Sequence, residues 1–169
     1  MQEIDRIIRV DHAGEAGAIG IYGAQLFIAR VLYKDMVLAL EDMIGHEREH
    51  FSTFDRLLKE RGIRRCYGLA LWVWGGTLLG VITTLMGRNA IWVCTNAIET
   101  TVLHHLQWQL AFLKQHDAQA YTAVLSIKSD EEAHQKMGQK NGNHSLFTRP
   151  IFWVVQQATE CAIWLSKKL

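Results

Sequence analysis

Two Glu-x-x-His motifs, Glu47/His50 and Glu131/His134, carry the residues of this sequence best suited to chemistry. Residues three positions apart lie on one face of a helix, and both motifs fall in stripes of apolar residues at helical spacing. Each stripe therefore directs a carboxylate and an imidazole into the core. Because a buried carboxylate without a partner is strongly unfavourable, we expect bound metal to compensate it.

Glu15 and Glu99 each lie in the apolar stripe of a further helix. Glu15 precedes Glu47 by 32 positions, and Glu99 precedes Glu131 by the same 32 positions. The two halves of the chain are thus offset by 84 positions, from 15 to 99 and from 47 to 131. A helix with Glu followed by a helix with Glu-x-x-His, twice, indicates an internal structural repeat.

Two helices that give one Glu each and two that give Glu-x-x-His supply the ligand set of ferritin-like di-metal carboxylate bundles. Four carboxylates and two neutral imidazoles carry four negative charges, which two divalent ions cancel. Oxygen and imidazole donors without thiolates favour Fe or Mn over a structural zinc site. We expect Glu47 and Glu131 to bridge the two ions, with the remaining Glu and His of each half completing one ion. The six predicted ligands are Glu15, Glu47, His50, Glu99, Glu131 and His134.

Three further residues are candidates for supporting the ligands. Asp130 lies beside a ligand and is placed either to orient a ligand imidazole or to sit on the helix surface. His12 and His105 are lesser candidates, and His105 lies off the Glu99 face, so we interpret it as a supporting or packing residue. The histidines expected to be ordinary surface residues are His46, His116 and His144.

Almost the whole chain has apolar residues at spacings of three and four, which predicts an all-α protein. We expect one domain over residues 1–169, a ferritin-like four-helix bundle with an apolar crossover helix and an additional C-terminal helix. The 169 residues are 49% hydrophobic, with a single Pro and no Gly/Pro/Ser-rich linker, as one compact domain requires. The predicted helices are 3–33, 35–61, 67–86, 89–115, 117–141 and 149–168.

The composition argues against several classes of protein. A net charge of +1 gives no support for a nucleic-acid partner. Three cysteines without CxxC spacing indicate reduced core thiols. The opening "MQEIDRIIRV" resembles neither a signal peptide nor a transit peptide, so we expect a bacterial protein or a mature fragment.

The segment from Tyr67 to Gly87 contains no charged residue and is long enough to be a transmembrane candidate. A single crossing would leave half of the predicted ligands on each side of the membrane. The segment is therefore expected to be a crossover helix, either buried or lying in the membrane interface with Trp72 and Trp74. The C-terminal helix is expected to extend the same apolar face. Flanking arginines expected to face anionic headgroups are Arg61, Arg64, Arg65 and Arg88.

A di-iron site beside a membrane-facing apolar surface suggests oxidation of a lipid by O2. The stretches "DRIIRVDHAGEAGA", "EREHF", "ETTVLHH", "DEEAH" and "AIWLSKKL" together resemble the demethoxyubiquinone hydroxylase family, over about Asp5 to Leu169. That family's six metal ligands fall on the six residues already chosen. The sequence departs from the family in having Leu106 after the paired histidines, where Tyr is common, and Gln135 after His134, where His is common.

The resemblance implies O2-dependent hydroxylation of the ring of a polyprenylated 6-methoxy-3-methylbenzoquinone or its quinol, with two Fe per chain and NADH as the ultimate reductant. It also implies peripheral association with an inner membrane, on the matrix face in mitochondria or the cytoplasmic face in bacteria. A lipid-binding accessory protein and a ubiquinone-biosynthesis complex are the partners it suggests.

Three alternatives stay open at this point. A membrane-bound di-iron quinol oxidase would need the same metal centre but would leave the quinone ring without a new oxygen. A non-catalytic iron-binding bundle is disfavoured by the uncharged stretch at 67–87, because storage cages need polar outer faces. A metal-free bundle would leave four buried carboxylates uncompensated.

Overall fold

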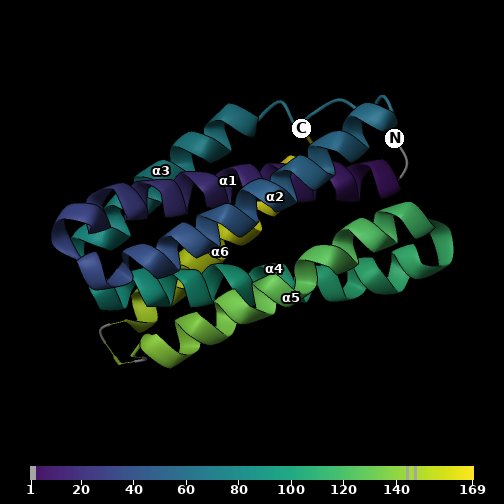
Figure 1. Ribbon diagram of the computed structural model, residues 1–169. Helices are drawn as coiled ribbons and strands as arrows, with labels where there is room; N and C mark the ends of the chain where they lie inside the picture. The colour runs from purple at the N-terminus through teal and green to yellow at the C-terminus, as the bar shows by residue number, and fades with distance from the viewer. Residues whose placement is uncertain (1–2, 144, 147) are drawn as a thin grey trace.

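The computed structural model describes residues 3–143, 145–146 and 148–169 (Figure 1). Within these residues every regular element is helical, which confirms the predicted all-α class. Each predicted helix is present to within three residues, except that 35–61 begins as a short 3₁₀ turn, η1 (Lys34–Met36). The predicted surface residue His144 lies outside the described residues. The helices are α1 (Glu3–Leu32), α2 (Val37–Glu60), α3 (Leu69–Leu85), α4 (Arg88–His116), α5 (Ala118–Asn141) and α6 (Arg149–Ser166).

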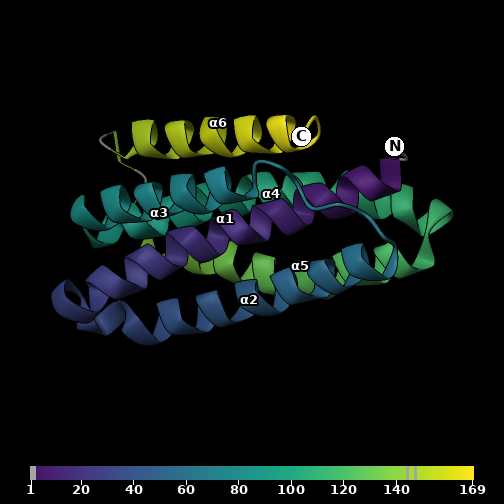
Figure 2. The same cartoon turned by 90° about the horizontal axis from the view of Figure 1, so that it is seen from above.

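The predicted ferritin-like bundle consists of α1, α2, α4 and α5. α1 packs on α2, α4 packs on α5, and α2 lies beside α5. Figure 2 shows three layers: α6 alone on one side, α3 with α1 and α4 in the middle, and α2 with α5 on the other side. The crossover helix α3 lies along α1, and α6 packs mainly on α4.

Asp117 ends α4 and begins α5, and so determines the turn between these two bundle helices. Asp117 interrupts the helical pattern between α4 and α5 with extended backbone, and its Oδ1 accepts a hydrogen bond from the Ala120 amide at 2.9 Å. An N-cap of this kind contributes about 1 kcal/mol. The same carboxylate accepts two hydrogen bonds from Arg61 at the end of α2. The α4–α5 turn is thereby attached to the first half of the bundle.

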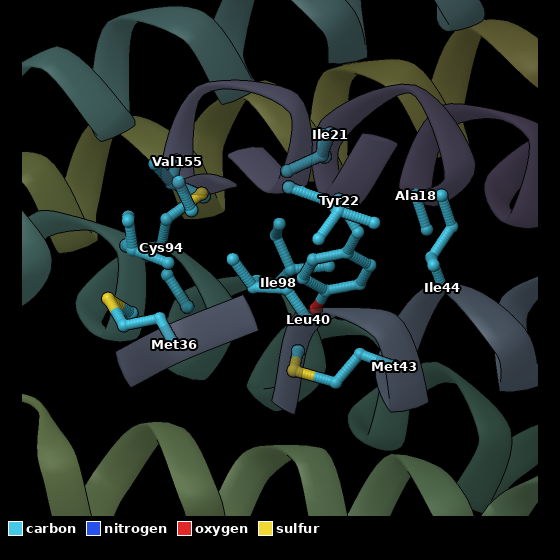
Figure 3. Packing of buried hydrophobic residues seen from close by; sticks show 14 residues of the cluster. Ala18, Ile21, Tyr22, Met36, Leu40, Met43, Ile44, Cys94, Ile98 and Val155 are labelled. Carbon is cyan, nitrogen blue, oxygen red and sulfur yellow. The ribbon is translucent and has the colours of Figure 1, made fainter. Parts of the chain in front are cut away.

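Two hydrophobic cores lie at opposite ends of the bundle. One surrounds Tyr22, Leu40 and Met43 (Figure 3), and the other surrounds Phe54 and Leu113. On each bundle helix, the predicted ligand glutamate comes between residues of the first core and residues of the second. Because truncating a fully buried Leu costs about 2–5 kcal/mol, these cores hold the four helices rigidly on both sides of the site.

α3 approaches α1 closely because its contact face consists of small residues. A Cβ at Gly76 would collide with the carbonyl oxygen of Gly17, and one at Gly80 would collide with that of Ile21. The opposite face of α3 is apolar and exposed, so the alternative of a buried crossover helix is wrong. The exposed apolar residues of α3 are Leu71, Val73, Trp74, Leu78, Ile82 and Leu85.

α6 also exposes large apolar residues, Trp153, Val154 and Trp164. None of the helices in the described part of the chain combines the length and the apolar run that a membrane crossing needs. One prediction about the thiols was wrong: Cys66 and Cys94 are buried, but Cys161 is exposed on α6.

The arginines expected to face headgroups have partners within the chain. Arg61, Arg65 and Arg88 form ion pairs with Asp117, Asp55 and Asp35. The Arg64 guanidinium lies 3.7 Å from the centre of the Tyr67 ring. Carboxylates on neighbouring segments thus engage three of the four side chains, which the positions of the arginines in the sequence did not reveal.

Candidate metal centre

The structure brings the six predicted ligands together between the two cores. They form two groups, and in each the candidate ligand atoms lie within 4.8 Å of one another. Glu47 and Glu131 belong to both groups, which is the relation expected of carboxylates shared by two ions. Both groups are fully buried. The first is Glu15, Glu47, His50 and Glu131, and the second is Glu47, Glu99, Glu131 and His134.

Both imidazoles turn Nδ1 toward the carboxylates. His50 Nδ1 lies 3.1 Å from Glu131 Oε1 and 3.6 Å from Glu15 Oε2. His134 Nδ1 lies 3.4 Å from Glu47 Oε1 and 3.6 Å from Glu131 Oε2. The Nδ1 atoms are therefore the nitrogens available to a cation in the centre.

The outward nitrogens contact polar residues of the opposite half. His50 Nε2 lies 3.1 Å from Asp130 Oδ2, and His134 Nε2 lies 3.1 Å from His46 Nδ1. A proton on Nε2, donated to these acceptors, leaves the Nδ1 lone pair free for a metal. Asp130 thus lies where the sequence placed a residue that orients an imidazole.

His46 is the site residue that the sequence interpretation missed. It was predicted to be an ordinary surface residue, but its ring is half-buried and stacks on His134 with centroids 5.3 Å apart. The repeat held a signal for it: His46 precedes Glu47 as Asp130 precedes Glu131, at the same 84-position offset. His116 is exposed on α4, as predicted.

Four ligand atoms without hydrogen-bond partners make the cluster suitable for a pair of cations. Glu47 Oε1, Glu131 Oε2 and the Nδ1 atoms of His50 and His134 are buried without a hydrogen-bond partner. Leaving four such atoms without a hydrogen bond in a core is costly. Divalent ions held between them would satisfy all four at once.

The buried ligand side chains shift one another's pKa values. Burial, followed by the nearby carboxylates, raises the pKa of Glu15 and of Glu99 well above the usual range. Burial opposes ionisation of Glu131 as well, but contacts with His134 and His50 outweigh it and lower the pKa of Glu131 to about 2. Burial also opposes protonation of the imidazoles, but Glu131, together with Glu15 at His50 and Glu47 at His134, outweighs it. The pKa of His50 is raised to about 11 and that of His134 to about 9. Metal binding would have to displace these protons.

Tyr22 provides a further contact that the sequence did not indicate. Its hydroxyl donates a hydrogen bond to Glu99 Oε1 at 2.5 Å from a fully buried position. Burial and the neighbouring carboxylates raise the pKa of Tyr22 well above its ordinary value, so the group remains a donor. In the sequence Tyr22 reads only as a member of an apolar stripe.

The two lesser histidine candidates have other partners. His12 Nε2 lies 3.4 Å from Asp55 Oδ1, and its ring lies against Phe51 with centroids 4.3 Å apart. His105 Nε2 lies 3.0 Å from Glu160 Oε2 on α6, and its ring also lines a cavity next to the ligand cluster.

That cavity has a volume of about 310 Å³ and lies among α1, α3, α4 and α6. Its walls are mainly apolar and include Ile21, Trp72, Leu79, Val102, Leu106 and Ile163. The carboxyl-bearing residues Glu15, Glu47, Glu99 and Glu131 line it as well. An apolar molecule in this cavity would therefore touch the candidate metal centre directly.

A four-helix bundle whose facing helices contribute two single glutamates and two Glu-x-x-His motifs defines the ferritin-like class of carboxylate-rich centres. Comparison with known families is more specific, because the model of "Ubiquinone biosynthesis protein COQ7" matches residues 2–166. The chain belongs to this family.

Curated relatives agree over nearly the whole chain. A Dictyostelium discoideum protein named NADPH-dependent 3-demethoxyubiquinone 3-hydroxylase, mitochondrial, is 32% identical over 99% of this chain and 78% of its own length. A human protein of the same name is 32% identical over 98% and 78%. The 3-demethoxyubiquinol 3-hydroxylase of Rhodospirillum rubrum is 32% identical over 98% and 78%.

Proposed function

We propose that this protein is a demethoxyubiquinone (or demethoxyubiquinol) hydroxylase, an O2-dependent di-iron monooxygenase of ubiquinone biosynthesis. The observation that carries the proposal is the meeting of two Glu/His groups, sharing Glu47 and Glu131, at the wall of an apolar cavity. The names of the relatives support the reaction class. Neither alternative, the quinol oxidase nor the iron-binding bundle, is favoured by any relative described above.

In this proposal, Glu15, His50, Glu99 and His134 would each hold one of two iron ions, and Glu47 and Glu131, which belong to both groups, would serve both. A di-iron pair supplies the two-electron reduction of O2 that monooxygenation needs. The protein orients the ligands: Asp130 and His46 fix the imidazole tautomers, and the Tyr22 hydroxyl fixes Glu99.

The cavity between α3 and α6 is proposed to bind the benzoquinone ring beside the metal centre and to exclude water from it. A polyprenyl tail is apolar and would extend along the same walls. The exposed apolar faces of α3 and α6 flank this cavity, and Lys168 lies over the Trp164 ring at 3.5 Å. Aromatic and basic residues at an apolar face favour the membrane interface, so we propose that the substrate enters from a membrane surface.

The ultimate electron donor is proposed to be a reduced nicotinamide. The family resemblance implied NADH, whereas the names of the Dictyostelium and human relatives specify NADPH. Those names also say mitochondrial, and peripheral binding to an inner membrane, on the matrix or the cytoplasmic face, follows from the same proposal. A lipid-binding accessory protein and a biosynthetic complex are proposed partners.

The decisive experiment loads the protein with iron anaerobically, then adds O2, a reductant and a short-tailed demethoxyquinone. Metal content and quinone mass are measured on the same sample. We expect two irons per chain and a gain of one oxygen atom in the substrate. Two irons with an unchanged quinone would move the function to an oxidase or to iron binding, and no bound metal would overturn the metal centre itself.

A further inference from the structure

The cavity has a second polar feature besides the ligand carboxylates. Gln109 on α4 donates a hydrogen bond from Nε2 to Asp11 Oδ1 on α1 at 2.8 Å, and both residues line the cavity. The remaining oxygens, Asp11 Oδ2 and Gln109 Oε1, are buried without a hydrogen-bond partner. Gln109 is only 2% exposed, so bulk water does not satisfy its oxygen.

The position of this pair relates it to the metal centre. Asp11 lies four residues before Glu15, which is one helical turn on the same face of α1, or about 6 Å along the axis. α1 and α4 run antiparallel, since Asp11 meets Gln109 while Tyr22 meets Glu99. The Asp11–Gln109 pair and the carboxylate cluster therefore line the same cavity about one turn apart, a spacing comparable to the width of a six-membered ring with two para oxygens.

When Asp11 is ionised, the two unpaired oxygens are both acceptors. Gln109 donates one of its two amide N–H groups to Asp11, and its carbonyl oxygen, which carries no hydrogen, can only accept. Burial raises the pKa of Asp11 to about 7, although the Gln109 hydrogen bond and the charge of Lys167 act in the opposite direction. The carboxylate thus has fewer donors than it needs. A ligand with a hydroxyl can donate a hydrogen bond to these oxygens.

We propose that Asp11 and Gln109 form a subsite that accepts a hydrogen bond from a ring hydroxyl, so that the cavity preferentially binds the reduced, quinol form of its substrate. This inference rests on the proposed function for the ring chemistry. The names of the relatives include both a demethoxyubiquinone and a demethoxyubiquinol hydroxylase, and they assign the choice between the two forms to no residue. Here that choice belongs to two residues outside the ligand set.

Binding, not turnover, tests the subsite. The protein is titrated anaerobically at pH 8, above the pKa of Asp11, with a short-tailed methoxy-methyl-hydroquinone and with the matching quinone. Quenching of tryptophan fluorescence reports the Kd of each. We expect the wild type to bind the quinol at least tenfold more tightly than the quinone. The quinone is the matched control because it has the same ring and tail but no hydroxyl to donate.

Three variants separate hydrogen bonding from packing. Asp11→Leu and Gln109→Leu each remove an acceptor, and the quinol/quinone preference should fall toward one in both. Asp11→Asn keeps the oxygen that accepts from Gln109 and replaces the free oxygen by an NH2 donor, so the preference should reverse toward the quinone. Thermal unfolding checks that each variant is folded.

Two results would overturn the subsite: a wild type that binds both forms within twofold, or a preference that Asp11→Asn leaves unchanged. Because no step of the titration requires iron or O2 chemistry, a failed hydroxylation assay would not affect this test. Conversely, a wild type that shows no preference for the quinol would rule out the subsite without contradicting the proposed hydroxylation.

Discussion

The two halves of the proposed metal centre supply identical ligands but surround them differently. At the three ligand positions, residues 84 apart are of the same type: Glu15 and Glu99, Glu47 and Glu131, His50 and His134. Immediately outside them the halves diverge. The outer partner of His50 is the carboxylate of Asp130, whereas that of His134 is the imidazole of His46.

Two more pairs of equivalent positions differ. Tyr22 donates a hydrogen bond to Glu99, while the position 84 residues later is Leu106 in the apolar cavity wall. His12 is buried beside Asp55, while its counterpart is Asn96. The ligand set is thus symmetric and its surroundings are not. We expect the two ions to be inequivalent, with tighter binding in the half where an anionic residue faces the imidazole.

Removing a residue that belongs to both ligand groups should affect both halves of the centre at once. Glu47→Ala should abolish binding of the metal pair and all hydroxylation, because the residue belongs to both ligand groups. Metal content by elemental analysis and product mass measure the two losses. Exposed Glu49→Ala, two positions along the same helix, is the matched control.

Stability distinguishes this loss from misfolding. Removing Glu47 takes away a contact with His134 as well as repulsion of Glu15 and Glu99, so the Tm of the metal-free protein should change little. The increase in Tm that metal gives the wild type should disappear. A large fall in the Tm of metal-free Glu47→Ala would instead mean that the carboxylate has a structural role.

Changing the outer partners should affect the halves separately. Asp130→Asn should weaken the ion bound by His50, and His46→Leu the ion bound by His134, each by about 10–100-fold. The carboxylate variant should show the larger effect because it also loses a charge. Stepwise metal titration gives the two affinities, and Mössbauer spectra of ⁵⁷Fe-loaded protein show which of two doublets changes.

A substitution that makes the halves alike sharpens the same test. His46→Asp gives His134 the kind of partner that His50 has, so the two Mössbauer doublets should move together and the weaker affinity should rise. If both doublets change equally in Asp130→Asn, the outer partners do not act on individual ions, and the asymmetry has another origin.

How far the sequence predicted this centre depends on what each residue does. Ligands had to lie on the inner face of a helix at fixed spacing, so periodicity and the 32-position interval were sufficient to choose Glu15 and Glu99. The role of His46 depends on the rotation of α2 against α5, which brings its ring onto His134. Periodicity along one helix carries no information about that rotation, although the repeat pointed to the position.

The arginines and the crossover helix show a related limit of prediction from sequence. Helical spacing predicted α3 to within two residues, yet its exposure depended on the small-residue contact of Gly76 and Gly80 with α1. Likewise, Arg61 and Arg88 find carboxylates far away in the chain. Pairings between distant segments follow from the packed fold, and a single sequence without its fold does not reveal them.

The two halves should also differ in how their stability depends on pH. His12 is a titratable residue, whereas Asn96 at the equivalent position of the second half is not. Burial lowers the pKa of His12 to about 4, against the raising effect of Asp55. An unfolded histidine takes up its proton near pH 6.5. Its stabilising contribution is therefore complete above pH 6.5 and is lost as the pH falls toward 4.

His12→Leu should reduce this acid loss by on the order of 2 kcal/mol of unfolding free energy. Urea unfolding of the metal-free protein at pH 7 and pH 4.5, with chelator present, compares the variant with the wild type. An unchanged difference between the two pH values would assign the acid sensitivity to other groups. The matched control is His116→Leu, the same change at an exposed position.

The smallest expected effect concerns the hydroxyl of Tyr22, which contacts the ligand Glu99. Tyr22→Phe keeps the ring that packs in the first core (Figure 3) and removes the donor to Glu99 Oε1, a loss of about 1–2 kcal/mol. Without that donor the pKa of Glu99 should rise further, since the Tyr22 hydrogen bond lowers it. The ion held by Glu99 and His134 should then bind several-fold more weakly while the other is unchanged. Equal weakening of both ions, seen in the same stepwise titration, would show instead that Tyr22 acts through the core that both halves share.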